Sequence, residues 1–196
     1  MWATPLQLAT ATAILANRGA VIQPRMLKAV DGVLIEPLNS DPKPDVFTDD
    51  ADYWSYIHEA MTMVVHRPYS DVFRDYGTAY ESIAMQDRAM PYTMAGKSGT
   101  AQVVGISQEI LSSEDIVVSD VNKDHGLFVS FAPAMHPEID PKIAVAVFVE
   151  NGEHGSSVAG PIAKQVIDSY LLDILRLDFH VADQEVAGAR VSQVDE

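Results

Sequence analysis

The sequence contains no cysteine, which excludes disulfide bonds and cysteine-ligated zinc sites. Basic residues are scarce: 13 lysines and arginines stand against 28 aspartates and glutamates, giving a formal net charge of −15. A surface of that sign repels phosphate, and no lysine- or arginine-rich cluster offsets it, so we expect no nucleic-acid partner. The longest apolar stretch, near residues 143–149, has only the length of a strand, so neither a signal peptide nor a membrane span is predicted within the sequence.

The composition that remains is that of a globular protein. The 196 residues are 47% hydrophobic, which is enough to bury one core. Apolar residues at helical spacing predict helices at residues 4–19, 52–66 and 161–175, with a shorter one at 77–85. Residues 155–157 are predicted to cap the last helix. Strand-forming stretches lie at residues 21–30, 92–106, 126–131 and 142–150. Turn-rich or polar connections are predicted at residues 36–50, 67–76, 107–124 and 133–141.

The order of these elements predicts the fold class. Three successive strands joined without intervening helices suggest an antiparallel sheet, with the first and last helices packed on one of its faces. We therefore expect an α/β protein of the α+β type, in which an antiparallel sheet is flanked by helices. Residues 1–177 form the folded unit, and residues 178–196 are predicted to be an acidic, disordered tail.

The segment M-A-G-K-S-G-T-A-Q-V at residues 94–103 has the strongest chemical character. Side chains alternate along a strand, so Ser98 and Thr100 share a face and can together bind one carboxylate. Lys97 adds a positive charge on a long stem, and Gly99 lets a ligand backbone come close. The Thr100 N–H is a candidate oxyanion donor. Gln102 lies on the same face, where it contacts a ligand or holds a neighbouring loop; the sequence leaves both open.

The segment at residues 94–103 could also be a phosphate-binding loop or a tight turn within an ordinary strand. The triplet beginning at Gly96 resembles the end of a phosphate-binding loop, but that motif needs a glycine where Pro91 stands, and its flanks should be strand and helix. We therefore exclude a phosphate-binding loop. A tight turn within an ordinary strand remains open from these residues alone.

The six histidines do not predict a metal site. His58 begins an H-E-x-x-H pattern, but Thr62 occupies the place of the second histidine. His125 precedes a predicted strand, where a structural hydrogen bond explains it. We expect neither a metal nor another cofactor.

The surroundings of the K-S-G-T segment resemble the class B penicillin-binding proteins, whose motif set includes K-[ST]-G. The matching segments are Ala3–Ala9, Ala16–Gly19, Tyr76–Ala79, Asp124–Pro133 and Val145–Gly152. The resemblance runs from about Trp2 to about Leu175, and its order and spacing are most like the transpeptidase of cell elongation.

The resemblance implies a partial transpeptidase fold of the penicillin-binding-protein and β-lactamase type. It implies a serine D,D-transpeptidase that cross-links peptidoglycan, with Lys97 and Thr100 catalytic and with Ser98, Gly99, Thr100 and Gln102 binding substrate. The implied partners are the D-Ala–D-Ala stem peptide, β-lactams and membrane proteins of cell elongation. The implied location is the periplasmic face of the bacterial inner membrane, with the anchor on an N-terminal portion outside this sequence.

One departure from the family changes the expectation for activity. The family also has S-x-x-K and S-x-N motifs, upstream of the helix that Ala3–Ala9 resembles. We expect both to be absent here, since Ser119 and Lys123 are one residue too far apart. The chain is thus expected to be the C-terminal part of a transpeptidase domain and inactive alone. The alternative is a non-catalytic binding or scaffold module that retains the K-S-G-T strand; a serine β-lactamase relative fits less well.

Overall fold

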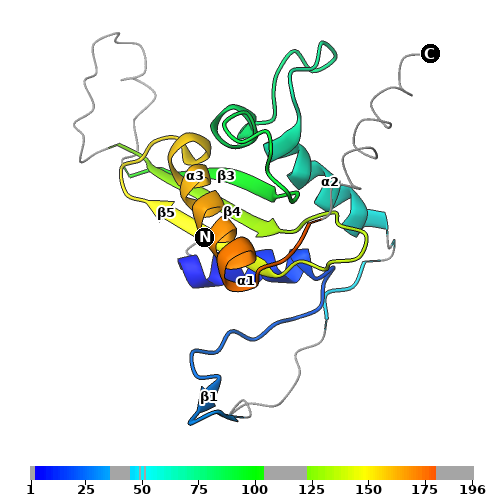
Figure 1. Cartoon of the computed structure of the whole chain (residues 1–196). Coiled ribbons are helices and arrows are strands. Elements are labelled where there is room, and N and C mark those ends of the chain that lie inside the picture. The colour runs from blue at the N-terminus through cyan, green and yellow to red at the C-terminus, as the bar shows by residue number, and fades with distance from the viewer. Residues whose placement is uncertain (1–2, 36–44, 49, 51, 104–122, 180–196) are drawn as a thin grey trace.

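The computed structural model describes residues 3–35, 45–48, 50, 52–103 and 123–179. The described elements begin, in chain order, with α1 (Pro5–Ala16), β1 (Ala29–Val30), β2 (Val33–Leu34) and α2 (Asp52–His66). The rest follow as η1 (Tyr80–Ala84), β3 (Ala95–Ala101), β4 (His125–Ala132), β5 (Ile143–Val149), α3 (Gly155–Asp168) and η3 (Ser169–Ile174), where η marks a short π-helical turn. Figure 1 shows the central sheet with α3 crossing in front of it.

The main sheet has three antiparallel strands in the order β3-β4-β5, so β4 is central and β3 forms an edge. Ser98 on β3 is paired with Phe128 on β4, which is paired in turn with Val147 on β5. The predicted fold class, an antiparallel sheet flanked by helices, is confirmed.

The two faces of the sheet pack against different helices. Phe128 and Phe131 stand an odd number of residues apart on β4, so their side chains point to opposite faces. Phe128 belongs to the larger core cluster with Ala163 of α3, whereas Phe131 belongs to a smaller cluster with Ala16 of α1. The expectation that the first and last helices share a face is therefore wrong. Sequence order does not fix the side on which a connection crosses a sheet.

Local sequence signals place the first two helices. Thr4 caps α1: its hydroxyl accepts a hydrogen bond from the Gln7 N–H, and the Gln7 side chain accepts one from the Thr4 N–H at 2.8 Å. Pro5 follows at the first helical position, where its missing N–H costs nothing. The predicted second helix, residues 52–66, is confirmed as α2.

The strand predicted at residues 21–30 is mostly wrong. Only Ala29 and Val30 are strand residues, and they pair with the two residues of β2 in a short hairpin. Large apolar side chains in this region stay exposed, among them Met26 and Leu34. No strand in the described part of the chain pairs with residues 21–28, so their apolar composition alone does not make them a strand. Figure 1 shows this hairpin projecting away from the main sheet.

The last long helix begins earlier than predicted. Its N-cap is His154, and Gly155 is the first helical residue, so Pro161 lies inside the helix and residues 155–157 are its first turn instead of its cap. A side chain at Gly155 would collide with the Leu127 carbonyl oxygen, 1.9 Å from the position of its first carbon. The first turn is thus packed directly on the β4 backbone, which a local sequence signal does not reveal.

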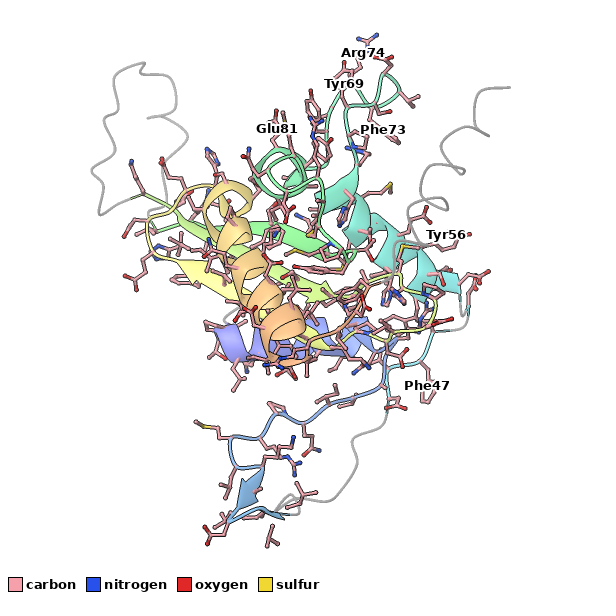
Figure 2. All side chains as sticks on the ribbon, viewed as in Figure 1. Phe47, Tyr56, Tyr69, Phe73, Arg74 and Glu81 are labelled. Carbon is pink, nitrogen blue, oxygen red and sulfur yellow. The ribbon has the colours of Figure 1, made fainter. Side chains whose placement is uncertain are left out.

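The structure describes only part of the predicted connections and of the predicted tail. Residues 67–76 form the predicted loop after α2, and Figure 2 shows Tyr69, Phe73 and Arg74 projecting from it. Most of the connections predicted at 36–50 and 107–124 lie outside the described residues, as do residues 180–196 of the predicted tail. Phe179, just beyond the predicted boundary of the folded unit, is buried in the larger core cluster.

Candidate functional site

The K-S-G-T segment lies on the exposed edge strand of the main sheet. Among the described residues, β3 pairs only with β4, so its other edge is unpaired. Lys97, Gly99 and Thr100 are exposed and Ser98 is half-buried. An unpaired strand edge offers backbone N–H and C=O groups to an extended peptide, and the adjoining side chains add selectivity. The four residues are therefore at least partly accessible to solvent instead of being buried in the core.

The register shows which way the hydroxyl groups point. A side-chain carbon at Gly96 would meet the ring of Phe128 at 2.5 Å, so Gly96, Ser98 and Thr100 share the face covered by α3. The Thr100 hydroxyl donates to the carbonyl oxygen of Glu153, 3.4 Å away and just before α3. That contact is long for a hydroxyl donor, which leaves the hydroxyl group available for an exchange of partner.

Lys97 and Gly99 provide the charge and the space. The Lys97 ammonium donates to the Ser98 carbonyl oxygen at 2.7 Å, which holds the positive charge against the strand next to the first hydroxyl residue. The nearest atom to a side-chain carbon built at Gly99 is the Leu127 Cβ, at an ordinary 3.5 Å. A cation and two hydroxyl groups therefore lie within a stretch of four residues on this strand.

Gln102 occupies a different position from the one expected. β3 ends at Ala101, so Gln102 is the first residue beyond the strand and is exposed. The predicted strand over residues 92–106 is thus shorter at both ends, and residues 104–106 lie outside the described part of the chain. Because strand alternation stops before Gln102, it does not by itself place this side chain on the face of Ser98 and Thr100.

A buried histidine supports the start of β3, and sequence analysis did not identify it. The Met94 N–H donates to Nε2 of His66, the last residue of α2, at 2.9 Å. Burial lowers the pKa of His66 to about 4. His66 is therefore neutral, and because Nε2 accepts, its ring proton is on Nδ1.

A charged cluster contacts Tyr92, which lies two residues before Met94 in the sequence. The Lys164 ammonium contacts Asp168 at 2.6 Å and Asp87 at 2.8 Å, and the Tyr92 hydroxyl donates to Asp168. Burial raises the pKa of Tyr92, and its bond to Asp168 adds to that effect. Burial alone would lower the pKa of Lys164, but Asp168 and Asp87 outweigh it and raise the pKa. Up to 77 positions separate these partners, so no local motif could have revealed the cluster.

Two other histidines, His58 and His125, have structural contacts. His58 is buried, its Nε2 lies 2.7 Å from the Leu15 carbonyl oxygen, and burial lowers its pKa. His125 accepts from the Asn151 N–H at 2.9 Å, which confirms its predicted structural role. A cavity of about 330 Å³ adjoins His58 near the end of α1 and residues 134–141, and no residue of β3 lines it. Within the described ranges, no group of three or more histidines and acidic residues could hold a metal ion.

The S-x-x-K and S-x-N motifs and a membrane-spanning helix were expected to be absent from the sequence. Ser40 and Lys43 do have the S-x-x-K spacing, so the expectation that it is absent is wrong. Both lie outside the described residues, and they follow the Ala3–Ala9 segment, whereas the family has its S-x-x-K before that segment. The 196 residues contain no S-x-N triplet. In the part of the chain that the structure describes, no helix has the length and apolarity to cross a bilayer.

Comparison with known proteins connects this geometry to a family. The model of the penicillin-binding protein transpeptidase domain matches residues 1–168. The peptidoglycan D,D-transpeptidase MrdA of Acinetobacter baumannii is 39% identical over 187 residues, which cover 95% of this chain and 25% of that protein. MrdA of Escherichia coli K12 is 34% identical over 190 residues, covering 95% of this chain and 27% of that protein.

Solved structures give the same relation. Penicillin-binding protein 2 of Pseudomonas aeruginosa, solved in complex with WCK 5153, is 41% identical with a TM-score of 0.66, covering 93% of this chain and 32% of that one. Penicillin-binding protein 2 of Helicobacter pylori, solved in complex with MreC, is 27% identical with a TM-score of 0.55, covering 87% of this chain and 25% of that one. The chain spans about a quarter of the length of the curated relatives it matches. On this evidence the chain belongs to the penicillin-binding protein transpeptidase-domain family.

Proposed function

We propose that this chain supplies the K-S-G-T side of the active site of a peptidoglycan D,D-transpeptidase of the penicillin-binding protein 2 type. The observation that carries the proposal is the exposure of Lys97, Gly99 and Thr100 on an unpaired strand edge, with the Lys97 ammonium held against that strand. An acyl-transfer enzyme needs such an edge, because its substrate is an extended peptide that ends in a carboxylate. The similarity to two MrdA proteins over 95% of this chain supports the same function.

The proposed reaction transfers a peptidyl group through a covalent intermediate. A serine attacks the D-Ala–D-Ala carbonyl of one stem peptide, the terminal D-alanine leaves, and the acyl group passes to an amine of another stem. Lys97 supplies positive charge and helps organise proton transfer, while Ser98 and Thr100 hold the terminal carboxylate. The Thr100 N–H is one donor to the developing oxyanion, and Gly99 keeps the strand accessible. A single donor of this kind contributes about 2.7–4 kcal/mol of transition-state stabilisation.

The wider setting is proposed on the same family relation. The stem peptide is the substrate, and β-lactams are inhibitors that acylate the same serine. Membrane proteins of cell elongation are candidate partners; a penicillin-binding protein 2 of H. pylori was solved with MreC. We place the protein at the periplasmic face of the inner membrane, with the anchor on a segment outside these 196 residues.

A fluorescent penicillin tests the proposal directly. We expect no covalent labelling of the 196-residue chain, because neither S-x-N nor an S-x-x-K before the Ala3–Ala9 segment is present. We expect labelling of the gene product that includes the coding sequence upstream of Met1, and loss of labelling in its Lys97→Ala variant. Ser40→Ala is the matched control in both proteins, and it should change neither result.

The outcomes separate the proposal from its alternative. Labelling of the 196-residue chain that Ser40→Ala abolishes would contradict the claim that the nucleophile lies elsewhere. An unlabelled upstream-extended product would overturn the transpeptidase proposal. If the upstream reading frame instead closes with a stop codon, the non-catalytic binding module becomes the better description.

A further inference from the structure

The three residues immediately before β3 are each bound to a different part of the molecule. We call residues 92–94 the lead-in. The Tyr92 hydroxyl donates to Asp168 at the end of α3, and the Met94 N–H donates to His66 at the end of α2. Between them, the Thr93 carbonyl oxygen accepts from the Ala134 N–H, which follows β4, at 2.9 Å. Three consecutive residues are thus fixed from three directions.

Burial makes these anchors strong. The side chains of Tyr92 and Met94 are 4% and 0% exposed, and both belong to the larger core cluster. Hydrogen bonds in such surroundings are costly to leave unmade, because water cannot replace the lost partner. The Thr93 hydroxyl adds a second contact by accepting from the Met135 N–H at 3.3 Å. The lead-in therefore has little freedom to shift.

The lead-in matters because β3 is an edge strand. β4 is the only strand that pairs with β3 in the described part of the chain, so the position of β3 also depends on how it enters the sheet. Lys97 lies three residues after Met94, and Thr100 three residues further. Reacting groups lose much of their effect when displaced by about 1 Å, so a fixed entry has a functional consequence.

We propose that His66 is a positioning residue for the K-S-G-T segment, acting through the Met94 N–H and together with Tyr92 and Asp168. His66 bonds to the residue that precedes the strand, so it acts on where the strand begins. The consequence for acyl transfer rests on the proposed function. The consequence for the strand itself does not, and the two can be measured separately.

Two variants of His66 distinguish positioning from simple packing. The Gln side chain carries its carbonyl oxygen the same number of bonds from the backbone as Nε2 of histidine, so His66→Gln retains an acceptor for the Met94 N–H. His66→Leu is similar in size but leaves that buried N–H without a partner. Hydrogen exchange of the backbone amides in the 196-residue chain is the first measurement.

We expect His66→Leu to raise the hydrogen-exchange rates of the β3 amides by about tenfold, while the rates of the amides that pair β4 with β5 change little. We expect the β3 amides of His66→Gln to exchange at the wild-type rates. Equal rates in the two variants, or equal acceleration of β5, would overturn the proposal. If His66→Leu does not fold, Tyr92→Phe replaces it. This variant keeps the ring but removes the bond to Asp168, and unchanged β3 exchange in it would also overturn the proposal.

The second measurement is the rate of fluorescent-penicillin labelling in the upstream-extended product, at a temperature where all variants are fully folded. We expect His66→Leu to slow labelling by about tenfold or more, and His66→Gln to stay within about threefold of wild type. Equal labelling rates in wild type and His66→Leu would overturn the positioning role. If the wild-type product is not labelled at all, the proposed function fails, and the exchange experiment still decides the role of His66.

Discussion

The edge strand β3 and the β1–β2 hairpin differ in what holds them in place. β3 is paired along its length with β4, and the residue before it is bound to His66. The β1–β2 hairpin is paired only with itself over two residues per strand, and Figure 1 shows it projecting from the body of the protein. Its apolar residues are exposed, Val33 at 69% and Leu34 at 67%.

This difference separates a strand that can position chemistry from one that cannot. An isolated two-stranded hairpin is marginally stable in water, whereas a strand on a covered sheet shares the stability of the core. The residues proposed to be functional, Lys97 to Thr100, lie on a strand of the second kind. An exposed edge can then accept a ligand while its inner side remains fixed.

The largest change in stability is expected for Phe128→Ala, which tests the difference between the main sheet and the hairpin region. Phe128 is fully buried on β4 beneath α3, so we expect the loss of its ring to lower the free energy of unfolding by about 3–5 kcal/mol. Phe47 lies in the segment after the hairpin, is 84% exposed and projects outward in Figure 2. The matched variant Phe47→Ala should change that free energy by less than about 0.5 kcal/mol. Urea denaturation measures both, and a comparable loss in the two variants would contradict the comparison.

A second test uses pH and the anchor at His66. Its pKa is lowered to about 4 in the folded protein from an ordinary 6.5, so between these values the unfolded chain binds a proton that the folded one does not. Stability from the neutral ring is complete above pH 6.5 and is lost as the pH falls to 4, by about 3 kcal/mol in all.

The control for that test is His66→Gln, which cannot titrate. We expect the free energy of unfolding of this variant, measured by urea denaturation at pH 7 and pH 4, to fall less than that of the wild type by about the same 3 kcal/mol. His58 also has a lowered pKa, but it is present in both proteins and cancels in the difference. Parallel pH profiles would show that His66 does not stay neutral in the fold.

The smallest change in stability is expected for alanine substitutions of the two glycines of β3, which should differ from each other. A side-chain carbon at Gly96 would lie 2.5 Å from the buried ring of Phe128, so Gly96→Ala should destabilise the protein by about 1–3 kcal/mol. At Gly99 the nearest atom is at 3.5 Å, so Gly99→Ala should leave stability within about 0.5 kcal/mol. Thermal unfolding of both variants measures this, and equal losses would show that the two glycines do not differ in packing.

The K-S-G-T strand and the first two helices could be predicted because their signals are local. Thr4, Pro5 and Gln7 form a cap within four residues, and residues 52–66 carry their apolar face in one helical period. The strand prediction for residues 21–30 used the same kind of signal and was wrong, since strands depend on a partner elsewhere in the chain. The start of α3 was missed for the same reason, because the backbone of β4 accommodates Gly155.

The sequence by itself determined the chemistry: a cation, two hydroxyl groups and a glycine in order at residues 97–100, within a chain of strongly negative charge. Only the tertiary structure decided that this strand forms an edge of the sheet, that α1 and α3 cover opposite faces, and that His66 and Asp168 hold residues 92–94. The physical reason is how far apart in the sequence the interacting groups lie. Side-chain identity and helical period are written in adjacent residues. By contrast, the buried hydrogen bonds of Met94 and Tyr92 join groups 28 and 76 positions apart, and the paired residues Ala95 and Phe131 lie 36 positions apart.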